Sequence, residues 1–166
     1  MKKLVIASAL ALAGMAAQAQ AVYGDIAYQM IDTDLSTDPA VLRGIVGYEI
    51  NPNMAVEGML GLNIKDGKED FGTGIEGKAK VDHLIGVYAK PKLKVNDALE
   101  LYGRVGFVSY KVKASAFGFS ESDSGSDLSF GVGASYNLTP NLSLNVDFMD
   151  FGDLEGGVAF GLKFKF

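Results

Sequence analysis

Residues 158–166 read Val158-Ala159-Phe160-Gly161-Leu162-Lys163-Phe164-Lys165-Phe166. In this stretch every second residue is apolar, and the residues between them are small or basic. Successive side chains of a β-strand point to opposite faces of its sheet, so a period of two is the sequence pattern of a strand. The stretch therefore predicts a strand with one apolar face and one small or charged face.

The same alternation recurs along the chain from residue 22 onward. No stretch after that point has apolar residues at the i, i+3, i+4, i+7 spacing of an amphipathic helix, and none is an apolar run of 18 residues. Strands of about ten residues are long enough to cross a bilayer when tilted. The expected strands are residues 22–30, 42–50, 54–64, 82–90, 99–107, 128–138, 142–148 and 158–166.

Short and long connections alternate between these strands. Short connections carry Pro or Asn, as turns do, whereas the longer ones carry most of the charge, Ser and Gly. This order predicts an all-β fold, an eight-stranded antiparallel up-and-down transmembrane β-barrel with short periplasmic turns and irregular external loops. The expected turns are 51–53, 91–97 and 139–141, and the expected loops are 32–39, 65–78, 111–127 and 152–156.

Composition decides which face meets lipid. A soluble eight-stranded barrel such as a lipocalin needs a water-facing wall rich in Lys and Glu. Here the residues between the apolar ones are mostly small, since the chain has 21 Gly, 48% apolar residues and only 21% charged residues. The apolar face is therefore expected to meet lipid, and the sparse polar face to line the lumen.

Charges of both signs fall on the inward face. An isolated buried ion is costly, so these residues are expected to pair as a structural network that fills the lumen. The alternative is a narrow porin-like channel for small solutes or ions, gated by the same charges. Besides Asp25, the expected network residues are Arg43, Glu49, Glu57, Lys90, Glu100, Arg104, Asp147 and Lys163.

The first 21 residues have the features of a secretory signal peptide. Lys2 and Lys3 precede an apolar run over residues 4–17, which is too short to serve as a membrane anchor. Small residues in an Ala-x-Ala pattern follow, and cleavage is expected after Ala19 or Ala21. The barrel domain is then residues 22–166.

Three segments resemble the small outer-membrane β-barrel family, which includes porin-family and OmpA/OmpX-like barrel domains and opacity-type surface proteins. These segments are residues 47–57 (GYEINPNMAVE), 101–106 (LYGRVG) and 131–142 (GVGASYNLTPNL). The final strand also resembles the C-terminal signal read by the barrel assembly machinery, through Val158, Phe160, Leu162, Phe164 and Phe166. The resemblance implies the outer membrane of a Gram-negative bacterium, with lipid and lipopolysaccharide as surroundings.

The sequence argues against a catalytic site, a metal site and nucleic-acid binding. With no Cys, thiolate nucleophiles and disulfides are excluded, and a net charge of −5 argues against nucleic-acid binding. The single histidine, His83, has no Ser within the next twenty residues, and Asp82 is expected on the opposite face. Loop carboxylates lack an ordered metal-ligand spacing. We expect no enzyme, cofactor or metal, but a surface role in which the external loops contact an extracellular ligand or host surface.

Overall fold

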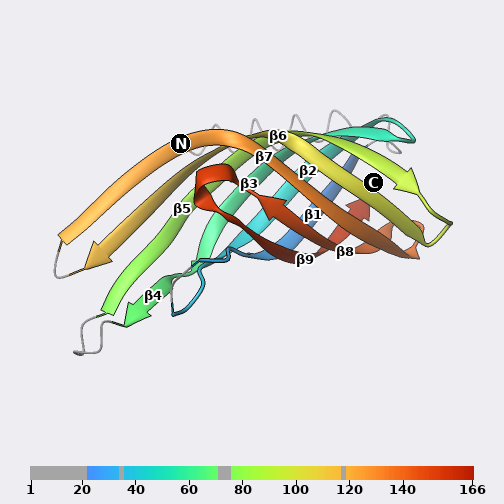
Figure 1. Ribbon diagram of the computed structural model, residues 1–166. Helices are drawn as coiled ribbons and strands as arrows, with labels where there is room; N and C mark the ends of the chain where they lie inside the picture. The colour runs from blue at the N-terminus through green and yellow to red at the C-terminus, as the bar shows by residue number, and fades with distance from the viewer. Residues whose placement is uncertain (1–21, 34–35, 71–75, 117–118) are drawn as a thin grey trace, which may run out of the picture.

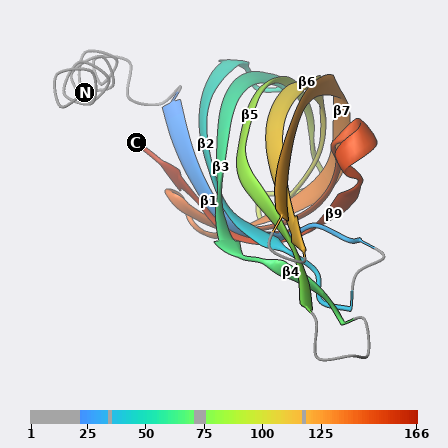
Figure 2. The same cartoon turned by 90° about the vertical axis from the view of Figure 1, so that its left-hand side faces the viewer.

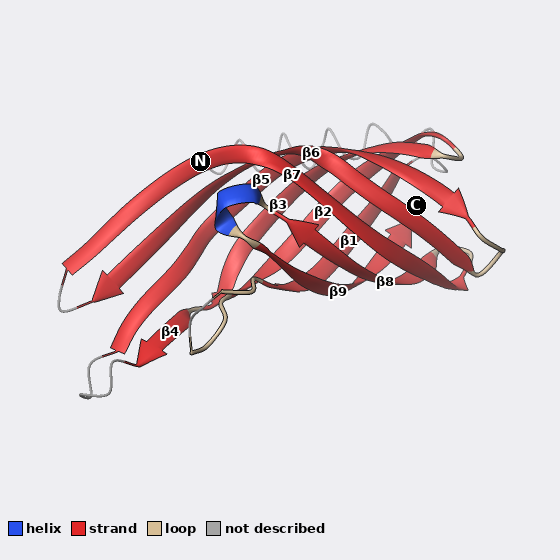
Figure 3. Ribbon diagram, viewed as in Figure 1, coloured by secondary structure: helices blue, strands red, loops and turns tan. Residues whose placement is uncertain are grey.

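The described chain forms one sheet that closes on itself. The computed structural model describes residues 22–33, 36–70, 76–116 and 119–166, so the expected leader lies outside it. Strands dominate the described residues, and within them one helical turn interrupts the strands (Figure 3). No helix in this part of the chain is long and apolar enough to cross a membrane.

The elements follow one another around the sheet in chain order, and each strand is antiparallel to its neighbours (Figure 1). Their bounds are β1 Val22–Met30, β2 Ala40–Asn51, β3 Met54–Lys65, β4 Gly67–Asp70, β5 Glu76–Lys94, β6 Leu99–Ala116, β7 Phe119–Thr139, β8 Leu142–Asp150, the 3₁₀ turn η2 Gly152–Leu154, and β9 Gly156–Lys165.

Two pairings close the sheet into a barrel, which Figure 2 shows in cross-section. β1 pairs with β9 from Tyr23↔Lys165 to Gln29↔Ala159, and β3 pairs with β5 from Met54↔Pro91 to Leu62↔His83. β4 pairs with the same strand, β5, further along, so β3 and β4 together form one wall strand. The prediction of a closed, eight-stranded, up-and-down antiparallel barrel is confirmed.

The faces of the wall are also as predicted. Large apolar side chains such as Val87 and Phe107 are exposed on the outside, at 63% and 65%, whereas Arg43 and Arg104 are buried inside. A water-soluble barrel would show the reverse arrangement. The outward apolar side chains form a continuous lipid-facing band around the wall.

Three strands are about twice as long as the sequence predicted. β5, β6 and β7 have 19, 18 and 21 residues, and the β6–β7 hairpin stays paired out to Ala116↔Phe119. The expected irregular loops at 65–78 and 111–127 are therefore mostly strands, which is a correction. In Figure 1 the β4–β5 and β6–β7 hairpins project at the left, opposite the short turns. We call the parts of these strands that lie beyond the lipid-facing band the extracellular arm. It comprises residues 76–82 of β5, 109–116 of β6 and 119–126 of β7.

A change in the pattern of alternation explains this error. On β6, Val105 and Phe107 face lipid, but Val108 and Tyr110 beyond them are buried on the inner side. The outward positions pass to Ser109 and hydrophilic residues after it. The side chains of β6 therefore continue to alternate between the two faces. Where the strand leaves the membrane, however, the apolar side chains change from the outer to the inner face.

The turns at the other end are short. β2 and β3 are joined through Pro52 and Asn53, and β7 and β8 through Pro140 and Asn141, as expected. The third turn is shorter than predicted, because β5 continues through Pro91 to Lys94. Short turns mark the periplasmic end of barrels of this kind.

Candidate functional site: the lumen and the extracellular rim

A buried ion-pair network crosses the middle of the lumen. Arg43 on β2 donates from both terminal guanidinium nitrogens to the two carboxylate oxygens of Asp147 on β8, at 2.7 and 2.8 Å. Arg104 on β6 approaches the same carboxylate at 2.9 Å. Gln29 accepts a further bond from Arg43 at 2.8 Å. One carboxylate thus joins two guanidinium groups from distant parts of the wall.

The network continues from Arg104 on β6 to the next two strands of the wall, β5 and β3. Arg104 Nε donates to Glu57 on β3 at 2.5 Å, and Lys90 Nζ on β5 lies 2.9 Å from the same carboxylate. The Lys90 ammonium also lies 4.0 Å from the centroid of the Tyr102 ring, a cation–π distance. All of these charged side chains are buried. Buried ions persist only when paired in this way.

Two tyrosines complete the network, and their rings pack over glycines of the neighbouring strands. Tyr23 donates to Glu57 at 2.5 Å, and Tyr102 donates to Asp147 at 3.0 Å. A Cβ added to Gly47 would lie 2.1 Å from Tyr23 Cζ. The inward glycines therefore leave the space that the tyrosine rings occupy.

A second charge cluster lies at the periplasmic mouth. Lys92 Nζ lies 2.8 Å from Glu49 and 3.9 Å from Glu100. Lys163 donates to Glu100 at 3.1 Å, and Lys165 Nζ lies 3.8 Å from Glu49. Glu49, Lys92, Glu100 and Lys165 border a pocket of about 440 Å³ at this end of the barrel.

The structure thus places the eight expected network residues in two clusters, one central and one at the mouth. Sequence reasoning missed Lys92 because its position was assigned to a turn. It also missed Tyr23, Tyr102 and Gln29, although inward parity on their strands could have identified them. Asp25, buried beside them, accepts a hydrogen bond from Asn145.

The extracellular half of the lumen is apolar. Side chains from β2, β3, β5, β6 and β8 meet there, and Phe151, fully buried just before η2, packs among them. Leu154 of η2 packs against this cluster at the extracellular end of the barrel. Charged and apolar layers therefore follow one another along the lumen. The apolar cluster comprises Ile31, Val41, Ile45, Met59, Val81, Leu84, Tyr88, Val108, Tyr110, Met149 and Phe151.

A β-bulge corrects the expected separation of Asp82 and His83. The pairing of β5 with β6 shifts by one residue between Val81 and His83. The Asp82 carboxylate therefore lies close to two basic side chains. Its oxygens are 3.8 Å from His83 Nδ1 and 3.3 Å from Lys113 Nζ. This bulge lies beyond the lipid-facing band, and the Lys113 ammonium lowers the pKa of the Asp82 carboxyl. Strict alternation cannot foresee such a bulge.

The five residues of the expected assembly signal share the outer face of the last strand and the residue after it. Phe160, Phe164 and Phe166 are exposed to the lipid side, and Val158 and Leu162 are half-buried between neighbours. Among the acidic residues of the first external loop, Asp34 lies outside the described residues. Within the described ranges, no group of three His, Cys, Asp or Glu side chains is arranged to hold a metal ion.

An apolar outer band, a charge-filled lumen and short turns at one end define an integral β-barrel of an outer membrane. The family model of the outer membrane protein beta-barrel domain matches residues 4–166, and the chain belongs to this family. The protein is therefore an outer-membrane protein of the Gram-negative type.

Known relatives agree with this assignment. The attachment invasion locus protein of Yersinia enterocolitica is 29% identical over 114 residues, which cover 69% of this chain but only 64% of that protein. The crystal structure of Ail, the attachment invasion locus protein of Yersinia pestis, is 25% identical with a TM-score of 0.58, over 88% of this chain and 97% of Ail. OprG of Pseudomonas aeruginosa, at 14% identity and a TM-score of 0.65 over 88% and 96%, shares the fold.

Proposed function

We propose that this protein is a non-enzymatic surface-contact barrel, in which the membrane wall is a scaffold and the extracellular arm binds a partner outside the cell. The observation that carries this proposal is the arm itself. Its strands stay paired well beyond the lipid-facing band, from Ser109↔Ser126 to Ala116↔Phe119. An ordered projection of this length is typical of segments that carry function.

The likeness to attachment proteins supports the same role. The Yersinia relatives are named for attachment and invasion, and Ail has also been solved with a heparin analogue, sucrose octasulfate. We extend attachment to this chain as a proposal, with a host cell surface as the class of partner. The filled lumen favours a scaffold over a channel, since its charges pair across the barrel.

A non-enzymatic role has its own support. Within the described residues His83 lies near Asp82 and hydrogen-bonds to no serine hydroxyl, so the histidine lacks the nucleophile that an acyl-transfer triad requires. The family is named for its membrane and its barrel, and the Yersinia enterocolitica relative for attachment and invasion; neither name refers to a reaction.

The experiment is a symmetric shortening of the arm. Lys113 and Ser122 are register partners, so replacing residues 114–121 with Asn-Gly closes the hairpin with a two-residue turn. Bacteria that display this variant should lose attachment to cultured epithelial cells, while insertion and heat-modifiable gel mobility stay unchanged. A milder variant, Phe117→Ser with Phe119→Ser, keeps the length of the arm and should weaken attachment too. Undiminished attachment by both variants would overturn the proposal.

We further propose that the outer face of β9, with Phe166 after it, carries the assembly signal, and that the leader is removed on export by cleavage after Ala19 or Ala21. Phe166→Ser should slow insertion by the barrel assembly machinery. Tyr136→Ser, a change to another lipid-facing aromatic residue near the periplasmic end, should slow insertion less.

The leader is tested separately. Mass spectrometry of the mature chain should find its first residue at Gln20 or Val22, following cleavage after Ala19 or Ala21.

A further inference from the structure

The pocket at the periplasmic mouth of the lumen holds charges of both signs in equal number. Its lining includes three lysines and three acidic residues, which are Lys92, Lys94, Lys165, Glu49, Asp97 and Glu100. An ion of one sign that entered this pocket would meet as many like charges as opposite charges. The lining is therefore better suited to a ligand that carries both signs.

The charged groups of this pocket keep unused hydrogen-bonding capacity. An ammonium group has three donors, and Lys92 Nζ donates one hydrogen bond, to Glu49 Oε1 at 2.8 Å. Lys92 Nζ lies 3.9 Å from Glu100 Oε2, and Lys165 Nζ lies 3.8 Å from Glu49 Oε1, which is too far for a hydrogen bond. Among the described residues, Glu49 Oε2 has neither a hydrogen bond nor an ion pair. Donors and acceptors therefore remain available to a ligand.

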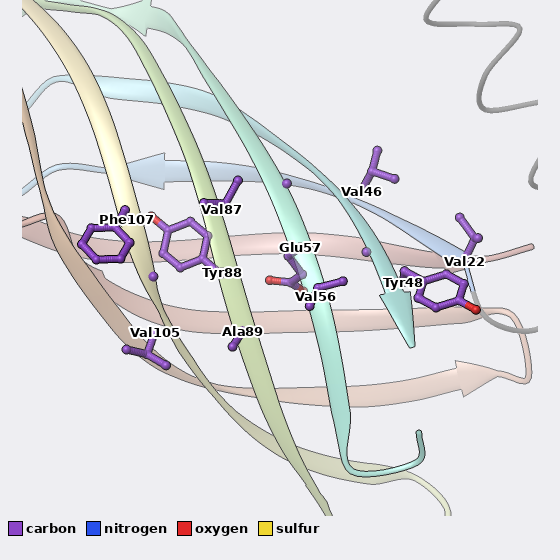
Figure 4. Close-up of a pocket in the computed structure, with 13 residues that line it drawn as sticks. Val22, Val46, Tyr48, Val56, Glu57, Val87, Tyr88, Ala89, Val105 and Phe107 are labelled. Atoms are coloured by element: carbon purple, nitrogen blue, oxygen red, sulfur yellow. The ribbon is translucent and has the colours of Figure 1, made fainter. Parts of the chain in front are cut away.

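The pocket is closed on its membrane side by the central network. Lys90 lies two residues before Lys92 on β5, on the same face, and its Nζ is 2.9 Å from Glu57. Figure 4 shows Glu57 and its neighbour Val56 on β3 pointing to opposite sides of the wall. The Lys92 side chain is only 3% exposed, whereas that of Lys165 is 34% exposed. A ligand therefore enters from the periplasm, past Lys165, and finds Lys92 at the floor.

We propose that this pocket binds a zwitterionic α-amino-carboxylate group presented from the periplasm. The ammonium of this group is bound by Glu49 and Glu100, and its carboxylate is bound by Lys92 and Lys165. Charge complementarity selects a zwitterion, because hydrogen bonds between ionised groups are the strong ones and a zwitterion can form them with both signs of the pocket. The inference rests on the outer-membrane placement of the protein and is independent of what the arm binds.

Two sources of this chemistry are present in the periplasm. One is a free amino acid, and the other is the diamino acid of a cell-wall stem peptide, whose side chain ends in an ammonium and a carboxylate on one carbon atom. The amides of Asn51 and Asn53 line the same pocket, and each keeps one polar end without a hydrogen bond among the described residues. These amides can bind peptide groups, so we expect the stem peptide to bind more tightly.

The test is a titration of the refolded full barrel in phosphatidylcholine nanodiscs, followed by the NMR shifts of its backbone amides. L-alanine and the stem tripeptide L-alanyl-γ-D-glutamyl-meso-diaminopimelate should both shift residues 49–53 and 92–94 saturably and leave the arm unchanged. Tighter binding of the tripeptide identifies the wall as the source, and equal binding identifies free amino acids. Propionate and ethylamine, which each keep one of the two charges of alanine, should bind about tenfold more weakly than L-alanine. Equally tight binding of either one would overturn the proposal.

Two variants remove one charge of each sign from the pocket. Glu49→Gln and Lys165→Gln should each weaken the binding of L-alanine about tenfold, because a charge-assisted hydrogen bond is lost. The matched controls are Glu121→Gln and Lys111→Gln, the same changes on the extracellular arm, and they should bind L-alanine as the wild type does. Equal losses in pocket and arm variants, or no saturable binding to the wild type, would contradict the proposal.

Heat-modifiable gel mobility checks that each variant is folded. If Glu49→Gln failed to fold, Lys165→Gln would carry the test alone, since its ion pair is long and partly exposed. Attachment of bacteria that display Lys165→Gln should be unchanged, so this test and that of the arm can fail separately.

Discussion

Arg43 and Asp147 form a two-point ion pair across the lumen, at 2.7 and 2.8 Å, although 104 residues separate them in the chain. The strands that carry them, β2 and β8, are separated by β1 and β9 in the sheet. Both side chains are almost fully shielded from solvent. The pair therefore joins two distant parts of the wall and, with Arg104, occupies the centre of the barrel.

Asp147→Asn should destabilise the barrel strongly. The variant leaves the guanidinium groups of Arg43 and Arg104 buried without one of their carboxylates, and breaking a buried pair costs about 3–5 kcal/mol. Urea unfolding of the refolded protein in vesicles measures the loss. Lys94→Ala, which breaks a solvent-exposed pair with Asp97, should leave the stability nearly unchanged. Equal effects of the two variants would contradict the role of the network.

Gly47→Ala should destabilise the barrel through Tyr23. The added methyl would lie 2.1 Å from Tyr23 Cζ and force the ring away from Glu57. Overpacking of this kind costs about 1–3 kcal/mol. Gly58→Ala is the matched control, since its methyl would meet open space and should shift stability by no more than about 0.5 kcal/mol. The same unfolding experiment separates them, and comparable losses would refute the packing argument.

Much of the wall was predictable because lipid imposes a strict alternation on every strand. Residues such as Val105 and Arg104 could be assigned to faces from parity alone, and the charged residues on the inner face had to pair. Which partners meet could not be predicted. Arg43 contacts Asp147 because of barrel closure and strand stagger, which no local pattern encodes.

The extracellular half was harder to predict for a physical reason. Beyond the membrane the surrounding solvent is water, so Tyr110 turns inward and Ser109 outward, and the expected apolar-outward pattern disappears. The same change concealed the apolar layer of the lumen. The bulge at Asp82 was hidden because one extra residue reverses the parity of everything beyond it.

Phe151→Ala tests the apolar layer. Phe151 is fully buried within the lumen cluster, and truncating a buried Phe costs about 3–5 kcal/mol. Phe148→Ala, three residues away on the lipid face, should cost less because lipid chains can fill the space. Hydrogen exchange should show faster opening around β8 and η2 in the first variant only. A similar response in both variants would show that the layer contributes little.

The central claim is that the lumen is a filled scaffold and that the protein acts through its outer surfaces. Single-channel recording of the refolded protein in planar bilayers tests this most directly. The account predicts no reproducible conductance steps, because Arg43, Arg104, Glu57 and Asp147 pair across the lumen beneath an apolar layer. Reproducible steps whose size changes in Glu57→Ala or Arg104→Ala would contradict it and identify the protein as a pore.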